Sequence, residues 1–389
     1  MKKLDKTSAM PLHQQLKNII QEKIKQGQFK TGEEIPSTAE LCACYQVSTI
    51  TVRRTISDLI AEGLLRGTPG KGTFVTSGEK KKNNKLVGVI FTGGMSNPFL
   101  LEIFRGIENV LSGFGYHLII SISEGNAEKE RQTLIEFRER GIDGIIMIPV
   151  SINRTSSANE SLKELLAKNV PLVFIDQKIT GFSVDYVASD NEKGSYMATQ
   201  YLLKLGHRRI AFIFGQEVSS VRERLAGYRR ALTEFNLPFD RSMIKSGHLE
   251  LEAEGCGYQN ALELLLLKTP PTAIFACNDP LALGVYRTCH QLGLNIPEDL
   301  SLVGYDNLFF TASLIPPLTT IHQPIYEMGR KAGELLLRRI TGENGNAEKI
   351  ILENQLIERS SCAPPPKRVR SSKAKSPGKK AVMKKGGMS

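Results

Sequence analysis

The chain has 389 residues, 41% of them apolar, which is enough to bury a sizeable core and suggests two or three domains. It has no apolar run of about 18 residues and no apolar stretch of the secretory kind at its start, so we expect a cytoplasmic protein that makes no membrane contact. The net charge of +11 is uneven: residues 1–85 hold 15 Lys and Arg against 8 Asp and Glu, residues 86–363 hold 27 against 32, and residues 364–389 hold 9 against none. Basic ends around an acidic centre favour a polyanionic partner for the ends and another role for the middle.

Residues 1–76 have the patterns of three helices and a hairpin. Apolar residues at helical spacing indicate a first helix; they are Leu12, Leu16, Ile19 and Ile20. A capping box that begins at Ser37 starts a second helix, and Ser48 is the N-cap of a third. The buried stripe of the third helix is formed by Val52, Ile56 and Leu59. Apolar residues at 64–66 and 73–75 flank a glycine-rich turn, which is a hairpin signal.

The face of the third helix opposite its buried stripe is basic. It carries Ile50, Arg53 and Arg54, and such a face suits a DNA major groove. The hairpin glycines let the backbone approach a phosphate ridge, and Lys71 at the hairpin tip offers a charge or a minor-groove contact. Two interpretations stay open for Ile50: contact with a thymine methyl group, or packing onto the second helix.

Four spaced motifs lie in register over about residues 8–76. They are Gly32-x-x-x-Pro36-Ser37-x-x-x-Leu41, Val47-Ser48-x-x-Thr51-Val52-Arg53-Arg54, Leu59-x-x-Glu62-Gly63-Leu64 and Gly70-x-Gly72-Thr73-Phe74-Val75. This pattern resembles the winged helix-turn-helix of GntR-family transcription regulators. The resemblance implies contact of the head with double-stranded operator DNA, through Ser37, Thr38, Ser48, Thr49, Ile50, Thr51, Arg53, Arg54, Gly70 and Lys71. Ala39 and Thr49 stand where members of that family often carry arginine, so the usual operator is not carried over.

The hydrophobic period changes after residue 76. Residues 77–85 have no apolar side chain and are expected to form a charged linker. Short apolar runs then alternate with helical patterns such as Asn191–Leu205 over roughly 280 residues, which predicts two lobes built on parallel sheets covered on both faces. The runs are 86–91, 118–122, 144–148, 172–175, 210–214, 273–276 and 300–303. Residues 362–389 are low in complexity and basic, and we expect a disordered tail.

Polar residues that follow the apolar runs are candidate ligand contacts, because ligands of open α/β sheets bind beyond the carboxyl ends of the strands. They include Asn97, Asp176, Asp190, Arg222, Arg224, Asn278, Asp279, Asp306 and Gln323. Carboxylates and amides chelate neighbouring hydroxyl groups and Phe99 can cover an apolar ring face, so the expected small-molecule effector is a sugar or a similar polyol. For Asp190 and Asn278, capping of the following helix is the alternative.

Further motifs are spread over residues 86–360. They include Ser189-Asp190-Asn191-x-x-Gly194, Leu205-Gly206-His207-Arg208-Arg209-Ile210, Arg224-Leu225-Ala226-Gly227-Tyr228 and Gly304-Tyr305-Asp306. Together they resemble the effector domain of LacI/GalR-type repressors, which has the two lobes and three crossovers of the type I periplasmic-binding-protein fold. The resemblance implies a cleft lined by Asn97, Phe99, Asp176, Asp190, Arg224, Asn278, Asp306 and Gln323. A GntR-like head joined to such a body resembles regulators of the arabinose-repressor type.

We therefore predict an α/β protein with a small winged helix-turn-helix head (1–76), a linker (77–85), a two-lobed, doubly wound effector domain (86–361) and a tail (362–389). Its predicted function is a ligand-responsive, DNA-binding transcription regulator, a repressor that acts as a homodimer on a pseudo-palindromic operator. No cofactor or metal is expected, since motifs for nucleotide binding, hydrolysis and metalloprotease chemistry are absent and the six cysteines lack metal-ligand spacing. Two alternatives stay open: a metabolic enzyme with a DNA-binding head, and a ligand-independent DNA-packing protein. An exported transport-type binding protein is disfavoured by the missing signal peptide.

Overall fold

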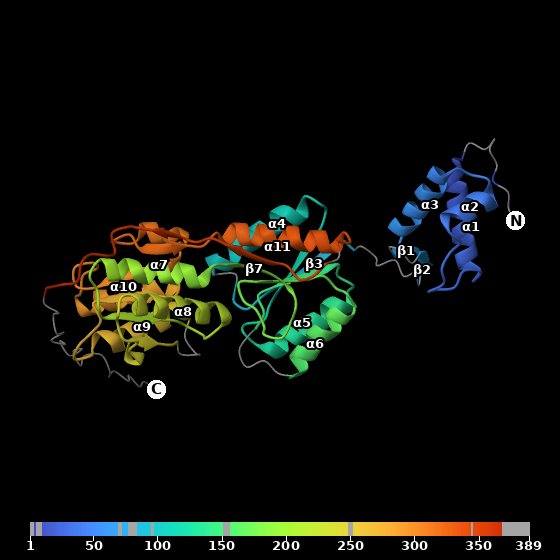
Figure 1. Cartoon of the computed structure of the whole chain (residues 1–389). Coiled ribbons are helices and arrows are strands. Elements are labelled where there is room, and N and C mark those ends of the chain that lie inside the picture. The colour runs from blue at the N-terminus through green and yellow to red at the C-terminus, as the bar shows by residue number, and fades with distance from the viewer. Residues whose placement is uncertain are drawn as a thin grey trace, which may run out of the picture. The chain divides into compact units, whose positions relative to one another are not determined.

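The computed structural model describes residue 4 and residues 10–68, 72–76, 84–94, 97–150, 156–247, 252–343 and 345–367 (Figure 1). The chain divides into two compact units. We call Met1–Lys85 with Arg140–Asp143 the head, and Leu86–Glu139 with Gly144–Ser389 the body. Across the described residues, no helix is long and apolar enough to cross a membrane.

The head contains three helices and a two-stranded hairpin, as predicted. Their bounds are α1 Leu12–Lys25, α2 Thr38–Tyr45, α3 Thr49–Ala61, β1 Leu65–Thr68 and β2 Gly72–Val75. Ser37 forms a capping box with Glu40 at the start of α2, and the Ser48 side chain caps α3 by accepting a hydrogen bond from the Thr51 amide. The two strands pair antiparallel, and α1 and α2 both pack on α3. The apolar core of the head consists of Leu16, Ile20, Ile35, Leu41, Val52, Leu59, Leu65 and Val75.

The body is built on two six-stranded sheets, one in each lobe (Figure 1). The sheet of lobe 1 has the order β13-β7-β6-β5-β3-β4 and is parallel throughout. The sheet of lobe 2 has the order β14-β12-β11-β10-β8-β9, and only β14 runs antiparallel to its neighbour. The strands are β3 Leu86–Phe91, β4 His117–Ile122, β5 Gly144–Met147, β6 Leu172–Ile175, β7 Asp185–Ser189, β8 Ile210–Ile213, β9 Ile244–Lys245, β10 Ala273–Ala276, β11 Ser301–Asp306, β12 Thr319–His322, β13 Lys349–Leu352 and β14 Gln355–Ile357.

The helices of the body pack in pairs along the sheets. Their bounds are α4 Pro98–Ser112, α5 Ala127–Glu139, α6 Ser156–Ala167, α7 Asn191–Lys204, α8 Ser219–Glu234, α9 Ala253–Leu265, α10 Asp279–Leu292 and α11 Ile325–Ile340, with short 3-10 turns η1 Arg241–Met243 and η2 Phe309–Ser313. In Figure 1, α4 lies beside α11, α7 beside α8 and α9 beside α10. The α4–α11 contact is close because both helices carry glycine: a Cβ on Gly106 would lie 2.1 Å from the Tyr326 carbonyl oxygen, and one on Gly329 would lie 2.1 Å from that of Ile103.

The chain passes between the lobes three times. It leaves lobe 1 after β7, returns after β12 to form α11 and β13, and enters lobe 2 again at β14. We call Asp190, Gln323–Pro324 and Glu353–Asn354 the crossover segments, since they link elements of different lobes. The α/β fold class with a winged helix-turn-helix and two lobes is therefore confirmed.

The strand boundaries differ from the prediction in places. β11 continues to Asp306, whereas the apolar run ends at Val303, because the sheet of lobe 2 buries the polar end of the strand as well. β7 was not found as an apolar run, because it begins with Asp185. Arg339 on α11 stabilises this buried carboxylate by donating two hydrogen bonds to it, at 2.8 and 2.9 Å.

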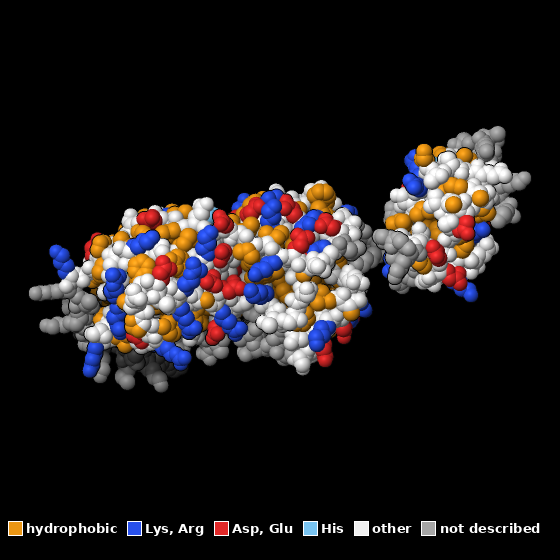
Figure 2. Space-filling view, viewed as in Figure 1, with side chains coloured by type: hydrophobic (Ala, Val, Ile, Leu, Met, Phe, Trp, Pro, Cys, Tyr) orange, Lys and Arg blue, Asp and Glu red, His pale blue; other side chains and the backbone are white. Residues whose placement is uncertain are grey.

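Charged side chains are mixed on the face of the body seen in Figure 2. Lys and Arg lie interspersed with Asp and Glu there, across both lobes. This face of the body therefore lacks the gathered positive charge that a nucleic-acid surface needs.

Candidate functional sites: the DNA interface and the interlobe cleft

The start of α3 presents hydroxyl groups whose positions are fixed by the helix cap. Ser48 Oγ accepts from the Thr51 amide at 3.3 Å and lies 2.9 Å from Thr51 Oγ1. Ser48 and Thr49 are exposed, and Thr49 Oγ1 lies 3.9 Å from Cys42 Sγ of α2. Hydroxyl groups at a helix N-terminus are suited to a phosphate, since the free backbone amides there also favour an anion.

The exposed side of α3 continues with Arg53 and Arg54. Within the described ranges, no carboxylate pairs with either guanidinium, so both charges face solvent. Ile50 is 80% exposed, which removes packing onto α2 as its role. An exposed isoleucine one turn before two arginines on an open helix face is suited to an apolar contact in a groove.

The other predicted head residues lie at the start of α2 and at the hairpin tip. Ser37 is exposed; its Oγ accepts from the Glu40 amide at 3.3 Å in the capping box and also donates to Glu40 Oε2 at 2.8 Å. Thr38 is half-buried. Gly70 and Lys71 lie outside the described residues.

A cleft of about 350 Å³ lies between the two lobes of the body. Its polar walls come from residues at the carboxyl ends of parallel strands in both sheets, as the fold predicts. Lobe 1 contributes Thr92 after β3, Glu124 after β4, and Asp176 and Gln177 after β6, and lobe 2 contributes Gln216 after β8, Asn278 after β10 and Asp306 at the end of β11.

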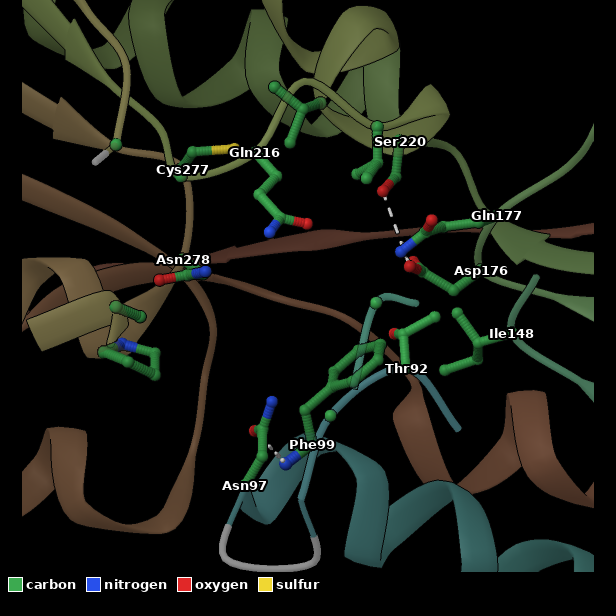
Figure 3. A pocket seen from close by; sticks show the side chains of 18 of the residues that line it. Thr92, Asn97, Phe99, Ile148, Asp176, Gln177, Gln216, Ser220, Cys277 and Asn278 are labelled. Carbon is green, nitrogen blue, oxygen red and sulfur yellow. Dashed lines mark hydrogen bonds between the residues drawn. The ribbon is translucent and has the colours of Figure 1, made fainter. Parts of the chain in front are cut away.

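The cleft brings together six of the eight predicted ligand contacts. They are Asn97, Phe99, Asp176, Arg224, Asn278 and Asp306. In Figure 3, Asn97 and Phe99, Asp176 and Asn278 point into one space from different sides. Asn278 Oδ1 caps α10 by accepting from the Leu281 amide at 2.9 Å, and the residue also lines the cleft.

Asp190 and Gln323 do not line the cleft. Asp190 caps α7, where its Oδ1 accepts from the Lys193 amide at 3.0 Å. Gln323 is fully buried and bonds Ser189 and Asp306. Both residues belong to crossover segments, so they lie behind the cleft wall.

Asp176 is the most unusual group of the cleft. Its side chain is 6% exposed and its backbone has a left-handed φ of 61°. Oδ2 accepts from Ser220 Oγ of lobe 2 at 3.4 Å, whereas no group in the described part of the chain donates to Oδ1 (Figure 3). Burial raises the pKa of Asp176 to about 6, although the nearby Arg224 opposes this change. A strained, buried carboxylate with a free oxygen is typical of a ligand-binding position.

Arg224 also lines the cleft, and its guanidinium group contacts several neighbouring residues. Nε donates to Asn191 Oδ1 at 2.8 Å, Nη1 donates to the Cys277 carbonyl oxygen at 2.5 Å, and Cζ lies 3.8 Å from the Tyr305 ring centroid. Nη1 is 3.8 Å from Asp306 Oδ1. These contacts fix the cation in place before any ligand enters, which reduces the entropy lost on binding.

Asp306 is the second buried carboxylate of the cleft. It also has a positive φ, 117°, and accepts a hydrogen bond from Gln323 Nε2 at 2.5 Å. Burial raises its pKa to about 7 against the opposing effect of Arg224. With Asp176 and Glu124 also on the wall, carboxylates outnumber the single guanidinium among the charged residues that line the cleft. This balance suits a neutral molecule with hydroxyl donors better than an anion.

Several lining residues were missed by sequence reasoning. Glu124 and Gln216 follow strands β4 and β8, so the strand-end rule applied to every strand would have found them. Ser220 lies on α8, one turn before Arg224, and carried no strand-end signal. Cys277 also lines the cleft; burial raises the pKa of its thiol to about 11, which keeps it protonated and a poor nucleophile. In the part of the chain that the structure describes, no three His, Cys, Asp or Glu residues are placed to bind a metal ion.

Known proteins resemble both parts of the chain. Residues 12–75 match the bacterial regulatory proteins of the gntR family, and residues 199–362 match periplasmic binding protein-like domains. The arabinose metabolism transcriptional repressor of Geobacillus stearothermophilus is 32% identical over 370 residues, which cover 92% of this chain and 99% of the relative. The chain belongs to the family of this arabinose metabolism transcriptional repressor.

Other relatives agree with this assignment. The ribose operon repressor of Haemophilus influenzae is 35% identical to the repressor over 329 residues, covering 81% of this chain and 95% of the relative. The solved structure of a LacI family transcriptional regulator from Enterococcus faecium with bound ribose has 34% sequence identity and a TM-score of 0.63, covering 72% of the repressor and 99% of that chain. The Geobacillus and Haemophilus relatives are repressors, which confirms the prediction of a transcription regulator rather than an enzyme.

Proposed function

We propose that the repressor binds a neutral monosaccharide in the interlobe cleft, and that this binding changes the affinity of the head for operator DNA. The observation that carries the proposal is Asp176 Oδ1, a buried carboxylate oxygen that faces the cleft without a donor in the described part of the chain. Leaving such an atom unpaired costs about 1–3 kcal/mol or more, and a sugar hydroxyl can supply the missing hydrogen bond.

The rest of the cleft supports the same ligand class. Asp176 and Asp306 can each accept from hydroxyl groups, Asn278 can donate through its amide, and the Phe99 ring can cover an apolar sugar face. A volume of about 350 Å³ is at the low end of ligand pockets, which run from about 300 to 1,000 Å³, so it favours a single sugar ring. The names of the ribose and arabinose repressors and the ribose-bound relative support a pentose.

On the DNA side, we propose that α3 enters the major groove. Ser48 and Thr51 contact phosphate, while Ile50, Arg53 and Arg54 face base edges. Supporting contacts come from Ser37, Thr38 and Thr49, and from Gly70 and Lys71 at the hairpin tip. We infer domain limits of 1–76 for the head, 77–85 for the linker, 86–361 for the effector domain and 362–389 for the basic tail. Since a repressor acts on chromosomal DNA, we infer that it works in the cytoplasm.

A homodimer is proposed because lobes 1 and 2 both expose large apolar side chains. Ile315 is 92% exposed and Phe309 80%, both in the segment between β11 and β12. Leu101 on α4 is 44% exposed and Tyr326 on α11 is 37% exposed. Exposed apolar surface is the kind of surface that association buries, and a second copy placed over these side chains presents two heads to a two-fold operator.

The sugar proposal is tested on an operator duplex selected by the repressor itself from random-sequence DNA. Fluorescence anisotropy then gives its dissociation constant with and without L-arabinose, D-ribose, D-ribose 5-phosphate and hypoxanthine. A neutral pentose is expected to change operator affinity by about 5- to 150-fold, and the phosphate ester and the purine are expected to have no effect. In Asp176→Asn, the response is expected to require about 10- to 100-fold more sugar. If no sugar alters operator affinity, the proposal is wrong.

The dimer proposal is tested by light scattering on the doubly substituted protein Phe309→Asp/Ile315→Asp. We expect a monomer with weakened operator binding, since each head then binds alone. Leu266→Asp is the matched control, because Leu266 is also an exposed apolar residue of lobe 2, at the end of α9. An unchanged dimer in the double variant, or a wild-type monomer bound to the operator, contradicts this part of the proposal.

A further inference from the structure

The first and third crossover segments are bonded to each other. The Asp190 amide donates to the Leu352 carbonyl oxygen at 2.9 Å, which ties the first segment to the end of β13. Asn354 Nδ2 donates to the Asp190 carbonyl oxygen at 2.8 Å and lies 2.9 Å from Tyr305 Oη. The first and third segments therefore form one hydrogen-bonded unit, so a displacement of one is transmitted to the other.

Gln323 connects this unit to the cleft. Its side chain is fully buried, and its Oε1 accepts from Ser189 Oγ at 2.5 Å, directly before the first crossover segment. Its Nε2 donates to Asp306 Oδ1 at 2.5 Å, and Asp306 lines the cleft. The orientation of the amide is fixed by its partners, because a carboxylate can only accept and the serine hydroxyl can donate.

The bond from Gln323 competes with other contacts of Asp306. The same atom, Asp306 Oδ1, lies 3.8 Å from Arg224 Nη1, and the backbone at Asp306 is strained at a φ of 117°. A sugar hydroxyl that donates to this carboxylate takes up part of its accepting capacity. A hydroxyl that donates to Oδ1 itself shares this acceptor with Gln323, and this changes the Gln323 bond and its link to Ser189.

The hinge itself contains an unsatisfied group. Only two buried side-chain polar atoms lack a hydrogen-bond partner in the described residues, Asp176 Oδ1 in the cleft and Asn354 Oδ1 in the third crossover segment. A buried carbonyl oxygen without a donor is unfavourable, so this arrangement of the crossover segments is less stable than one in which Asn354 Oδ1 is bonded. A hinge whose bonds are incompletely satisfied is easier to shift by a bound ligand.

We propose that Gln323 is the positioning residue that transmits occupancy of the cleft to the hinge between the lobes, through Asp306 on one side and Ser189 on the other. This inference rests on the proposed function, because it specifies how the sugar in the cleft alters the head. It assigns Gln323 to coupling rather than to ligand contact.

The test separates sugar binding from its effect on DNA. For the full chain, the coupling ratio is the operator dissociation constant at saturating L-arabinose or D-ribose divided by the value without sugar, and calorimetry gives the sugar dissociation constant. Ser189→Ala removes the hinge side of the link and leaves the cleft wall intact, and Gln323→Met removes both bonds at similar side-chain volume. Thr199→Val is the control, since Thr199 carries a buried α7 hydroxyl that donates within its own helix, to the Ser195 carbonyl oxygen at 2.9 Å.

We expect both variants to bring the coupling ratio about tenfold closer to 1, while sugar affinity changes by less than about threefold. The double variant should bring the ratio no closer to 1 than the stronger single variant does, because both act on one link. Thr199→Val should keep the wild-type ratio. A wild-type ratio in Ser189→Ala overturns the proposal even if Gln323→Met fails to fold. If neither sugar shifts operator affinity in the wild type, the proposed function fails instead.

Discussion

Replacing Asp176 with asparagine is expected to stabilise the sugar-free repressor and to weaken sugar binding. The pKa of Asp176 is raised from 3.8 to about 6, chiefly by burial. A difference of this size corresponds to about 3 kcal/mol of lost stability, since each pKa unit is worth about 1.36 kcal/mol. Asparagine keeps an oxygen for the Ser220 bond and carries no charge, so a large part of this loss should be recovered.

The sign of the effect follows from proton binding. The folded protein holds the Asp176 proton more tightly than the unfolded chain does. The loss of stability is therefore absent below about pH 4, grows as the pH rises through about pH 6, and is complete above that. The stability gained in Asp176→Asn should accordingly be largest at pH 8 and small at pH 4.5.

The assay is thermal unfolding of wild type and variant between pH 4.5 and 8, with sugar affinity measured in parallel at pH 8. Losing an ionised hydrogen-bond acceptor should weaken sugar binding by about 10- to 100-fold, because a hydrogen bond to a charged group contributes about 1.5–3 kcal/mol. Asp185→Asn is the matched control, because Asp185 is also a buried carboxylate but accepts two hydrogen bonds from Arg339. Its replacement should destabilise the body. Asp176→Asn that is less stable than wild type at pH 8 would refute this reasoning.

Four further outcomes are expected. Sugar affinity should rise between pH 5 and 8, because Asp176 and Asp306, with pKa values of about 6 and 7, accept best when ionised; calorimetry at a series of pH values checks this. If Ile50 contacts a thymine methyl group, replacing that operator thymine with uracil should weaken wild-type binding by about fourfold, because burying one methyl group is worth about 0.8 kcal/mol. The same replacement should not change the operator affinity of Ile50→Ala. Gly106→Ala should lower stability by about 1–3 kcal/mol in denaturant unfolding, since the new Cβ would meet the Tyr326 carbonyl oxygen at 2.1 Å. Deleting residues 364–389, which hold nine Lys and Arg, should flatten the dependence of log K on log salt by up to about 0.9 for each phosphate that the tail neutralises; an identical slope would show the tail takes no part.

Much of the fold could be predicted because its signals are local. Ser37 and Ser48 cap their helices through bonds to residues three positions on, so the helix starts are visible in the sequence. The alternation of short apolar runs with helical patterns marks the parallel sheets in the same way. Strand ends were harder to place where tertiary contacts bury polar residues, as Arg339 does for Asp185.

The candidate site was less predictable, because the strand-end rule says which residues lie near a cleft and not which way they face. Asp176 and Asp190 both follow strands of lobe 1, yet only Asp176 reaches the cleft. Its positive φ turns the side chain away from the path of the strand, whereas Asp190 enters α7 at once and caps it. The strand-end rule could not indicate Ser220 either, since this residue lies on helix α8 of lobe 2.

The sequence by itself determined the class of protein and its parts: a basic head with a helix-turn-helix pattern, a two-lobed α/β body, and polar residues gathered at strand ends. Tertiary structure alone decided the roles of individual side chains. Ile50 is exposed because α2 does not cover it. Asp176 Oδ1 stays unpaired because no donor in the described body is placed to bond it. Gln323 belongs to the hinge because the chain crosses there between lobes. Local patterns arise from neighbours in the chain, whereas burial and hydrogen-bond partners are set by residues more than a hundred positions away, as with Ser189 and Gln323.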